Sequence, residues 1–337
     1  MFQKTQFQTK HKDGSITCGL CSRKCVFKKD GQRGFCFIRG RENDQLGLTC
    51  YNKLISMNID PIEKKPLYHF LPNTEILSLG TIGCNMNCAF CQNWQISRCR
   101  DDYVMQIELT PKQVREIALQ KKCKAVAFTY NEPIVFYEYV KDCAELCRKK
   151  KIKTIAVSAG NITSKARQEF FSFIDAVNID LKGFSNEFYK EHVGVNLKTV
   201  LNTIEYVKNK TNTWLELTNL VIPGKNDDEK MIRKMCQYIK QNLGTDVPLH
   251  FSAFYPCYKM SDVNPTPLKT LITAREIALI EGLKHVYVGN VENPQTSSTY
   301  CSNCGKILIE RNQYETKIKG LKDGFCKHCN TKLKGVF

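Results

Sequence analysis

The chain has 337 residues, of which 42% are hydrophobic and 10% aromatic, enough to fill one large globular domain with small additions. Its 18 cysteines indicate reduced thiols and metal ligands, because residues 1–10 hold no apolar signal core and the chain is too large for a disulfide-stapled secreted module. We therefore expect a cytoplasmic protein without a membrane span. The formal net charge of +17 would permit a nucleic-acid partner, but no recognised binding module accompanies it.

The first region, residues 1–72, is expected to be a small four-cysteine segment followed by a proline-stiffened strap. Its cysteines have C-x2-C-x3-C-x10-C spacing: Cys18, Cys21, Cys25 and Cys36. Four thiolates complete the coordination of either a structural zinc or an auxiliary iron–sulfur cluster, and this spacing fits both. Zinc would only hold the segment together, whereas a cluster could relay electrons.

Three further cysteines follow an apolar, strand-like run at residues 75–82. Cys84, Cys88 and Cys91 have C-x3-C-x2-C spacing within one short loop. An iron–sulfur cubane held by protein alone takes four cysteine ligands, so three leave one iron with an open position. Structural zinc usually takes a C-x2-C pair and a distant second pair. The loop therefore predicts a [4Fe-4S] cluster with an open iron.

From residue 73 to 292, short apolar runs alternate with helical patterns. The predicted strands are residues 75–82, 125–130, 153–158, 176–181, 214–222, 247–253 and 285–288. The predicted helices are residues 110–122, 134–150, 164–171, 200–207, 228–242 and 266–281, with caps at Thr110 and Thr266. This order predicts parallel strands and a partial (β/α) TIM-like barrel. A doubly wound sheet competes, but its glycine-rich phosphate loop is missing.

Polar residues stand at the predicted strand ends, where the chemistry of such barrels gathers. Asn131 and Glu132 follow the second strand. The third and fourth strands end in a further set: Ser158, Asn161, Asp180 and Lys182. These residues could be ordinary caps and turns, or could bind a cofactor or an acceptor. His250 follows in a later strand, where a lone histidine is more often structural.

The last region, residues 293–337, has C-x2-C-x21-C-x2-C spacing, close to that of a zinc ribbon. Its cysteines are Cys301, Cys304, Cys326 and Cys329. Such a small segment cannot bury enough apolar surface unaided, so bound metal would supply its folding energy. We expect zinc here.

The cluster loop, with aromatic Phe90 directly before Cys91, resembles that of radical S-adenosylmethionine (SAM) enzymes. Residues 60–70, the run at 91–94 and the terminal ribbon extend this likeness over nearly the whole chain. In this combination the chain resembles the AmmeMemoRadiSam-system radical SAM enzymes, relatives of pyruvate formate-lyase activating enzymes.

The resemblance implies that SAM chelates the open iron and that one electron from the cluster releases a 5′-deoxyadenosyl radical, which takes hydrogen from a protein or small-molecule acceptor. Residues 129–133 occupy the place of the family's Gly-Glu-Pro element, which receives the methionyl ammonium, although Tyr130 and Asn131 replace its glycine pair. The expected SAM-binding residues are Phe90, Asn131, Glu132, Ser158, Asn161, Asp180 and Lys182.

Expected partners are a one-electron reductant such as flavodoxin or ferredoxin and, by the family's name, Memo-type and AMMECR-type proteins. The first alternative is an activase of glycyl-radical enzymes, because residues 180–182 resemble an element of those proteins. The second is a zinc-stapled module that binds nucleic acid or protein. That module would hold zinc alone, without labile sulfide, and would have no use for a three-cysteine loop.

Overall fold

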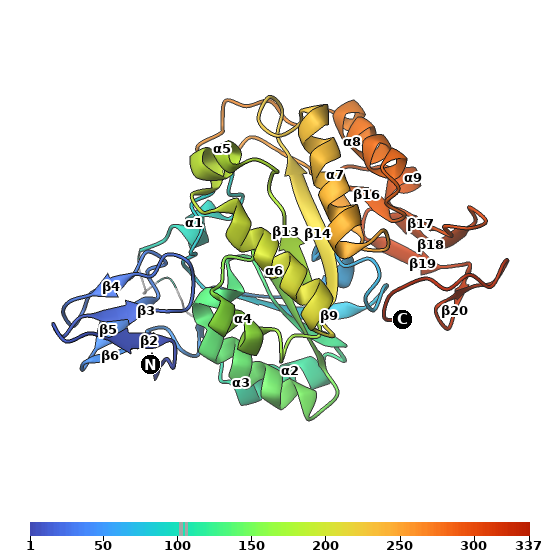
Figure 1. Cartoon of the computed structure of the whole chain (residues 1–337). Coiled ribbons are helices and arrows are strands. Elements are labelled where there is room, and N and C mark those ends of the chain that lie inside the picture. The colour runs from blue at the N-terminus through green and yellow to red at the C-terminus, as the bar shows by residue number, and fades with distance from the viewer. Residues whose placement is uncertain (101–103, 105–106) are drawn as a thin grey trace.

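The computed structural model of the chain describes residues 1–100, 104 and 107–337. At its centre lies an eight-stranded sheet with the order β16-β15-β14-β13-β12-β11-β9-β8 (Figure 1). Its strands are β8 (Ser56–Pro61), β9 (Glu75–Gly80), β11 (Ala125–Phe128), β12 (Lys153–Ser158), β13 (Ala176–Asp180), β14 (Trp214–Val221), β15 (Leu249–Ala253) and β16 (Val286–Gly289). Neighbouring strands are parallel except β8, which pairs antiparallel with β9. Within the described ranges β8 and β16 do not pair, so the sheet is open.

Helices connect the parallel strands, as the alternating sequence predicts. They are α2 (Pro111–Gln120), α3 (Tyr137–Arg148), α4 (Ser164–Phe170), α6 (Leu197–Lys210), α7 (Glu229–Leu243) and α8 (Leu268–Ile280). Helix α6 lies against β14, and α8 lies against β15 and β16 (Figure 1). Shorter turns are α1 (Trp94–Ser97), α5 (Asn186–Phe188), α9 (Pro294–Ser297), the 3₁₀ turns η1 (Ile62–Lys64) and η3 (Pro133–Phe136), and the π turn η4 (Tyr189–Val193). The expected parallel α/β sheet is confirmed.

Small antiparallel sheets flank the central sheet on opposite sides (Figure 1). The N-terminal strands are β1 (Gln3–Lys4), β2 (Gln8–Lys10), β3 (Ile16–Cys18), β4 (Val26–Phe27), β5 (Arg39–Glu42), β6 (Gln45–Leu48) and β7 (Lys53–Leu54), the last paired with β10 (Ile107–Glu108). The C-terminal strands are β17 (Thr299–Tyr300), β18 (Ile307–Asn312), β19 (Glu315–Ile318), β20 (Leu321–Lys322) and β21 (Phe325–Cys326). The domain boundaries expected at residues 72 and 292 fall outside strands and helices and stay predictions.

Helix caps show where local sequence decides the structure. Thr110 and Gln113 form the predicted capping box, since each side chain accepts the other's backbone N–H. The cap expected at Thr266 is wrong. Its hydroxyl accepts the N–H of Phe254 at 2.9 Å and donates to the carbonyl of Val221 at 2.6 Å. Thr266 therefore ties two strand ends together, and α8 begins after Pro267.

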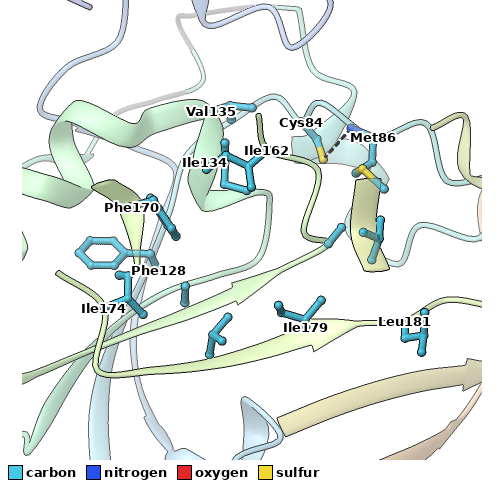
Figure 2. Close-up of a cluster of buried hydrophobic side chains, with 14 of the residues drawn as sticks. Cys84, Met86, Phe128, Ile134, Val135, Ile162, Phe170, Ile174, Ile179 and Leu181 are labelled. Atoms are coloured by element: carbon cyan, nitrogen blue, oxygen red, sulfur yellow. Dashed lines mark hydrogen bonds between the residues drawn. The ribbon is translucent and has the colours of Figure 1, made fainter. Parts of the chain in front are cut away.

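The hydrophobic core continues from the sheet to the three-cysteine loop. Figure 2 shows Phe128 and Phe170 packed deep in this core, with Ile179 and Leu181 on and beyond β13. Cys84 belongs to the same buried cluster. The loop is thus anchored in packed side chains. No helix of the described chain is long and apolar enough to cross a membrane.

Candidate functional site

The carboxyl ends of the parallel strands surround a cavity of about 390 Å³. Cys84, Cys88 and Cys91 line it together. Five of the seven residues expected around SAM line it as well: Phe90, Asn131, Glu132, Asp180 and Lys182. The structure therefore gathers side chains from a loop and two distant strand ends into one hollow, as the strand-end rule expects.

Asn131 holds the backbone of the cysteine loop. Its side-chain amide donates to the carbonyl of Gly83 at 2.8 Å and to that of Ile82 at 3.1 Å, and its oxygen accepts the N–H of Thr81 at 3.2 Å. Gly83 has a φ of +78°, where glycine is favoured, and an added Cβ would lie 2.0 Å from the carbonyl oxygen of Cys36. Asn131 is therefore a positioning residue that fixes the direction of the loop.

Glu132 is a buried carboxylate at the cavity wall, with only 3% of its surface exposed. It accepts the hydroxyl of Ser158 and the N–H of Ala159, both at 2.8 Å. Burial raises the pKa of Glu132 to about 7, although these donors favour the ionised form. A bound cation would relieve that penalty, so the site suits an ammonium group.

Asp180 and Lys182, which also line the cavity, form an ion pair with 2.9 Å between Nζ and Oδ2. Burial disfavours the charged lysine, but Asp180 and the Cys88 sulfur outweigh it and raise the pKa of Lys182 above its ordinary value. The ammonium also lies 5.6 Å from the centre of the Phe90 ring. The cavity thus places the Glu132 carboxylate and the ion pair of Asp180 and Lys182 beside the cysteines.

The other two expected SAM-binding residues, Ser158 and Asn161, do not line the cavity. Ser158 donates its hydroxyl to the carboxylate of Glu132 and so orients that side chain. Asn161 accepts the hydroxyl of Ser22 at 2.6 Å through its side chain, and its backbone carbonyl accepts the amide of Asn85 at 2.9 Å. Asn161 therefore links the N-terminal segment to the cysteine loop.

Sequence reasoning left His250 open and did not single out Tyr314 or Glu216. His250 lines the cavity, and its Nε2 lies 2.7 Å from the buried carboxylate of Glu216. Tyr68 packs edge-on against His250, and Tyr314 reaches the cavity from the C-terminal region. A charged residue inside an apolar strand, Glu216, was the one available signal, because a buried carboxylate needs partners.

The four C-terminal cysteines form a compact thiol cluster. Their sulfur atoms all lie within 4.8 Å of one another, with 3.5 Å between Cys301 and Cys329 and 3.7 Å between Cys304 and Cys326. Zinc–sulfur bonds of about 2.3 Å place tetrahedral ligands about 3.8 Å apart. The cluster therefore has the geometry of a site for one metal ion, and the expected C-terminal metal-binding module is supported.

Comparisons with known proteins agree with this site. Residues 79–236 match the Radical SAM superfamily model, which includes the cysteine loop and the strand ends through β14. The chain is 40% identical over 333 residues to an uncharacterised protein of Methanocaldococcus jannaschii, covering 98% of both chains. It is 24% identical over 203 residues to the pyruvate formate-lyase 1-activating enzyme of Escherichia coli, covering 56% of this chain and 82% of that protein.

A solved structure extends the comparison to the fold. The radical SAM methyltransferase from Sphaerobacter thermophilus matches with a TM-score of 0.53 at 11% identity, covering 91% of this chain and 81% of that protein. At that identity the likeness concerns the fold alone. A Radical SAM domain implies a [4Fe-4S] cluster and SAM, and three cysteines beside the buried Glu132 carboxylate in one cavity fit both. The chain is therefore an enzyme with a Radical SAM domain at residues 79–236, and it is homologous to the pyruvate formate-lyase activating enzymes.

Proposed function

We propose that this enzyme binds a [4Fe-4S] cluster through Cys84, Cys88 and Cys91 and uses it with SAM to take a hydrogen atom from an acceptor. The convergence of these cysteines with Glu132 and Lys182 in one cavity carries the proposal. Among the described residues, only the C-terminal cysteines have ligand atoms all within 4.8 Å of one another. The three loop cysteines do not form such a compact group, which supports a bound group larger than a single ion. Such a cluster, when bound, supplies the electron that cleaves SAM to the 5′-deoxyadenosyl radical.

The chain's own residues would bind SAM and hold it in place. Glu132 would receive the methionyl ammonium, with Ser158 and Ala159 fixing its carboxylate. Lys182, which lines the same cavity, would receive the SAM carboxylate. Asn131 would keep the loop, and therefore the cluster, at a fixed distance from both. The apolar core beneath the loop excludes water from that side.

Several finer features belong to the same proposal. We place zinc in the C-terminal site, and we regard the open parallel sheet as a partial (β/α) barrel within residues 73–292, between the flanking regions 1–72 and 293–337. The electron donor would be a flavodoxin or a ferredoxin, and the compartment the cytoplasm. Memo-type and AMMECR-type proteins are the protein partners that the family resemblance suggests.

A second candidate is the activation of a glycyl-radical enzyme. It is favoured by the similarity to the pyruvate formate-lyase 1-activating enzyme, which covers most of that relative. The hydrogen acceptor would then be a glycine in a loop of a large partner protein. A glycyl radical detected by electron paramagnetic resonance (EPR) in a co-purified partner, formed only with SAM and reductant, would distinguish it from other acceptors.

The test is anaerobic reconstitution with iron and sulfide, followed by dithionite and SAM. We expect 5′-deoxyadenosine and methionine from the wild type and neither from Cys88→Ala. The control is Cys236→Ala, a fully buried cysteine on α7 away from the cavity, which should keep full product yield. Equal product from wild type and Cys88→Ala would reject radical generation at this loop.

A further inference from the structure

We propose that Cys18, Cys21, Cys25 and Cys36 hold a second [4Fe-4S] cluster, packed directly against the loop of the first. All four side chains line one cavity at the junction of the N-terminal segment and the central sheet. The remaining wall includes the aromatic rings of Phe27 and Phe35. Four convergent thiols in an enclosed, largely apolar hollow are the ligand set of a closed metal centre.

The spacing of the sulfur atoms selects between one ion and a cluster. At the C-terminal site all four sulfurs lie within 4.8 Å of one another. Across the described chain no three of the N-terminal cysteines meet that limit, and neither do the three cysteines of the cavity loop. A single ion needs its sulfurs at the corners of a small tetrahedron, whereas a cubane places a block of iron and sulfide between its ligands. The N-terminal set is therefore not arranged as a compact single-ion site, which favours the larger cubane.

The two cysteine-bearing segments contact each other through their backbones. The carbonyl of Cys36 approaches Gly83 so closely that a Cβ there would lie 2.0 Å from it, and Gly83 directly precedes Cys84. Arg23 donates from Nε to the carbonyl of Asn85 at 2.9 Å, and Asn85 also lines the N-terminal cavity. A group bound by the N-terminal cysteines would therefore lie beside the loop that binds the first cluster.

Arg23 also gives the second site a free hydrogen-bond donor. Its guanidinium stacks on Phe35, 3.7 Å from the ring centre, and it lines the same cavity as the cysteines. Its Nη2 is buried and has no hydrogen-bond partner in the part of the chain that the structure describes. Buried donors are normally satisfied, so this one points to a missing acceptor such as a thiolate or a cluster sulfide.

The experiment counts iron, sulfide and zinc in the full-length protein after anaerobic reconstitution. We expect about eight irons, about eight sulfides and about one zinc in the wild type. A triple variant, Cys84→Ala with Cys88→Ala and Cys91→Ala, should keep about four irons and give an EPR signal of a reduced cluster after dithionite. Cys21→Ala with Cys36→Ala should also keep about four irons, whereas the control Cys236→Ala keeps about eight.

A further readout tests the contact between the sites. With both clusters reduced, the wild type should show an EPR spectrum broadened by interaction of the two spins, and each variant should show a narrow one. About two zincs with four irons in the wild type, or loss of all iron in the triple variant, would overturn the second cluster. If the N-terminal double variant does not fold, the triple variant still decides the matter. Formation of 5′-deoxyadenosine is measured separately. The proposed reaction and the proposed second cluster can therefore be rejected independently of each other.

Discussion

Among single residues, Glu132 carries the most specific part of the proposed SAM site. Glu132→Gln keeps the size of the side chain but removes the charge that would receive the ammonium. A hydrogen bond to a charged group contributes about 1.5–3 kcal/mol. We therefore expect the dissociation constant for SAM to rise roughly 10- to 100-fold. Equilibrium dialysis of the reconstituted protein with labelled SAM measures it, and the iron content should stay at the wild-type value.

The matched control for this change is Glu187→Gln. Glu187 is an exposed carboxylate in the first turn of α5, outside the cavity lining. Its loss should leave SAM binding unchanged. If Glu132→Gln bound SAM as tightly as Glu187→Gln, with equal iron in both, the methionyl ammonium would have to be held elsewhere.

Individual residues also show how much of the site can be predicted from the sequence. The spacing of the cysteines along the chain is enough to predict the ligand sets. Cysteines that bind one group must either be close in sequence or be brought together by a turn. The direction of a polar side chain depends on partners far along the chain. Ser158 turns to Glu132, and Asn161 turns to Ser22, 139 residues away. Strand-end position could not reveal these partners, so both residues lie behind the cavity wall that they were expected to line.

At the level of elements, β18 is attached to the residues that precede β9. Arg311 on this strand is fully buried, donates to the carbonyl of Tyr68 at 2.7 Å and lies 3.9 Å from the carboxylate of Glu63. Arg311→Met would leave that carboxylate buried without a counter-charge. Breaking a buried pair from one side costs about 3–5 kcal/mol. We expect a loss of that size in the free energy of unfolding, measured by urea denaturation.

Two variants control this measurement. Lys317→Met, on neighbouring β19, removes an exposed lysine that pairs with Glu315, and should change the free energy of unfolding by less than about 0.5 kcal/mol. Arg311→Met combined with Glu63→Gln should recover part of the loss, because the unpaired charge is gone. Equal stability of Arg311→Met and Lys317→Met would show that β18 is held by other contacts.

The elements themselves follow from sequence patterns wherever the pattern is local. The box of Thr110 and Gln113 opens α2 as predicted, and the apolar runs become the parallel strands. The strand β8 was not predicted: residues 56–59 show no strand pattern in the sequence, and residues 60 and 61 begin the expected strap. Residues 56–61 pair with β9 because the sheet has a free edge there, which is a property of the assembled sheet.

Across the whole molecule, the strap, the sheet and the C-terminal region meet around buried histidines. His69 bonds the carbonyl of Lys334 at 2.9 Å and the hydroxyl of Tyr287 at 2.5 Å. Its ring lies 4.6 Å from that of His285. Burial lowers the pKa of His69 to about 3 and that of His285 to about 4. Both rings are therefore neutral in the folded protein at neutral pH.

This junction predicts how stability depends on pH. Below about pH 6.5 the unfolded chain protonates both histidines while the folded chain does not, so stability is full above that pH and falls toward pH 4. Each histidine contributes a slope of up to about 1.4 kcal/mol per pH unit. His285→Phe keeps a buried ring but removes one titrating group. It should therefore lower the pH dependence of the unfolding free energy by the share of one histidine. Urea unfolding between pH 7.5 and 4.5 measures both proteins, and metal loss affects them alike, so their difference isolates His285. Parallel curves would mean that His285 is already charged in the fold.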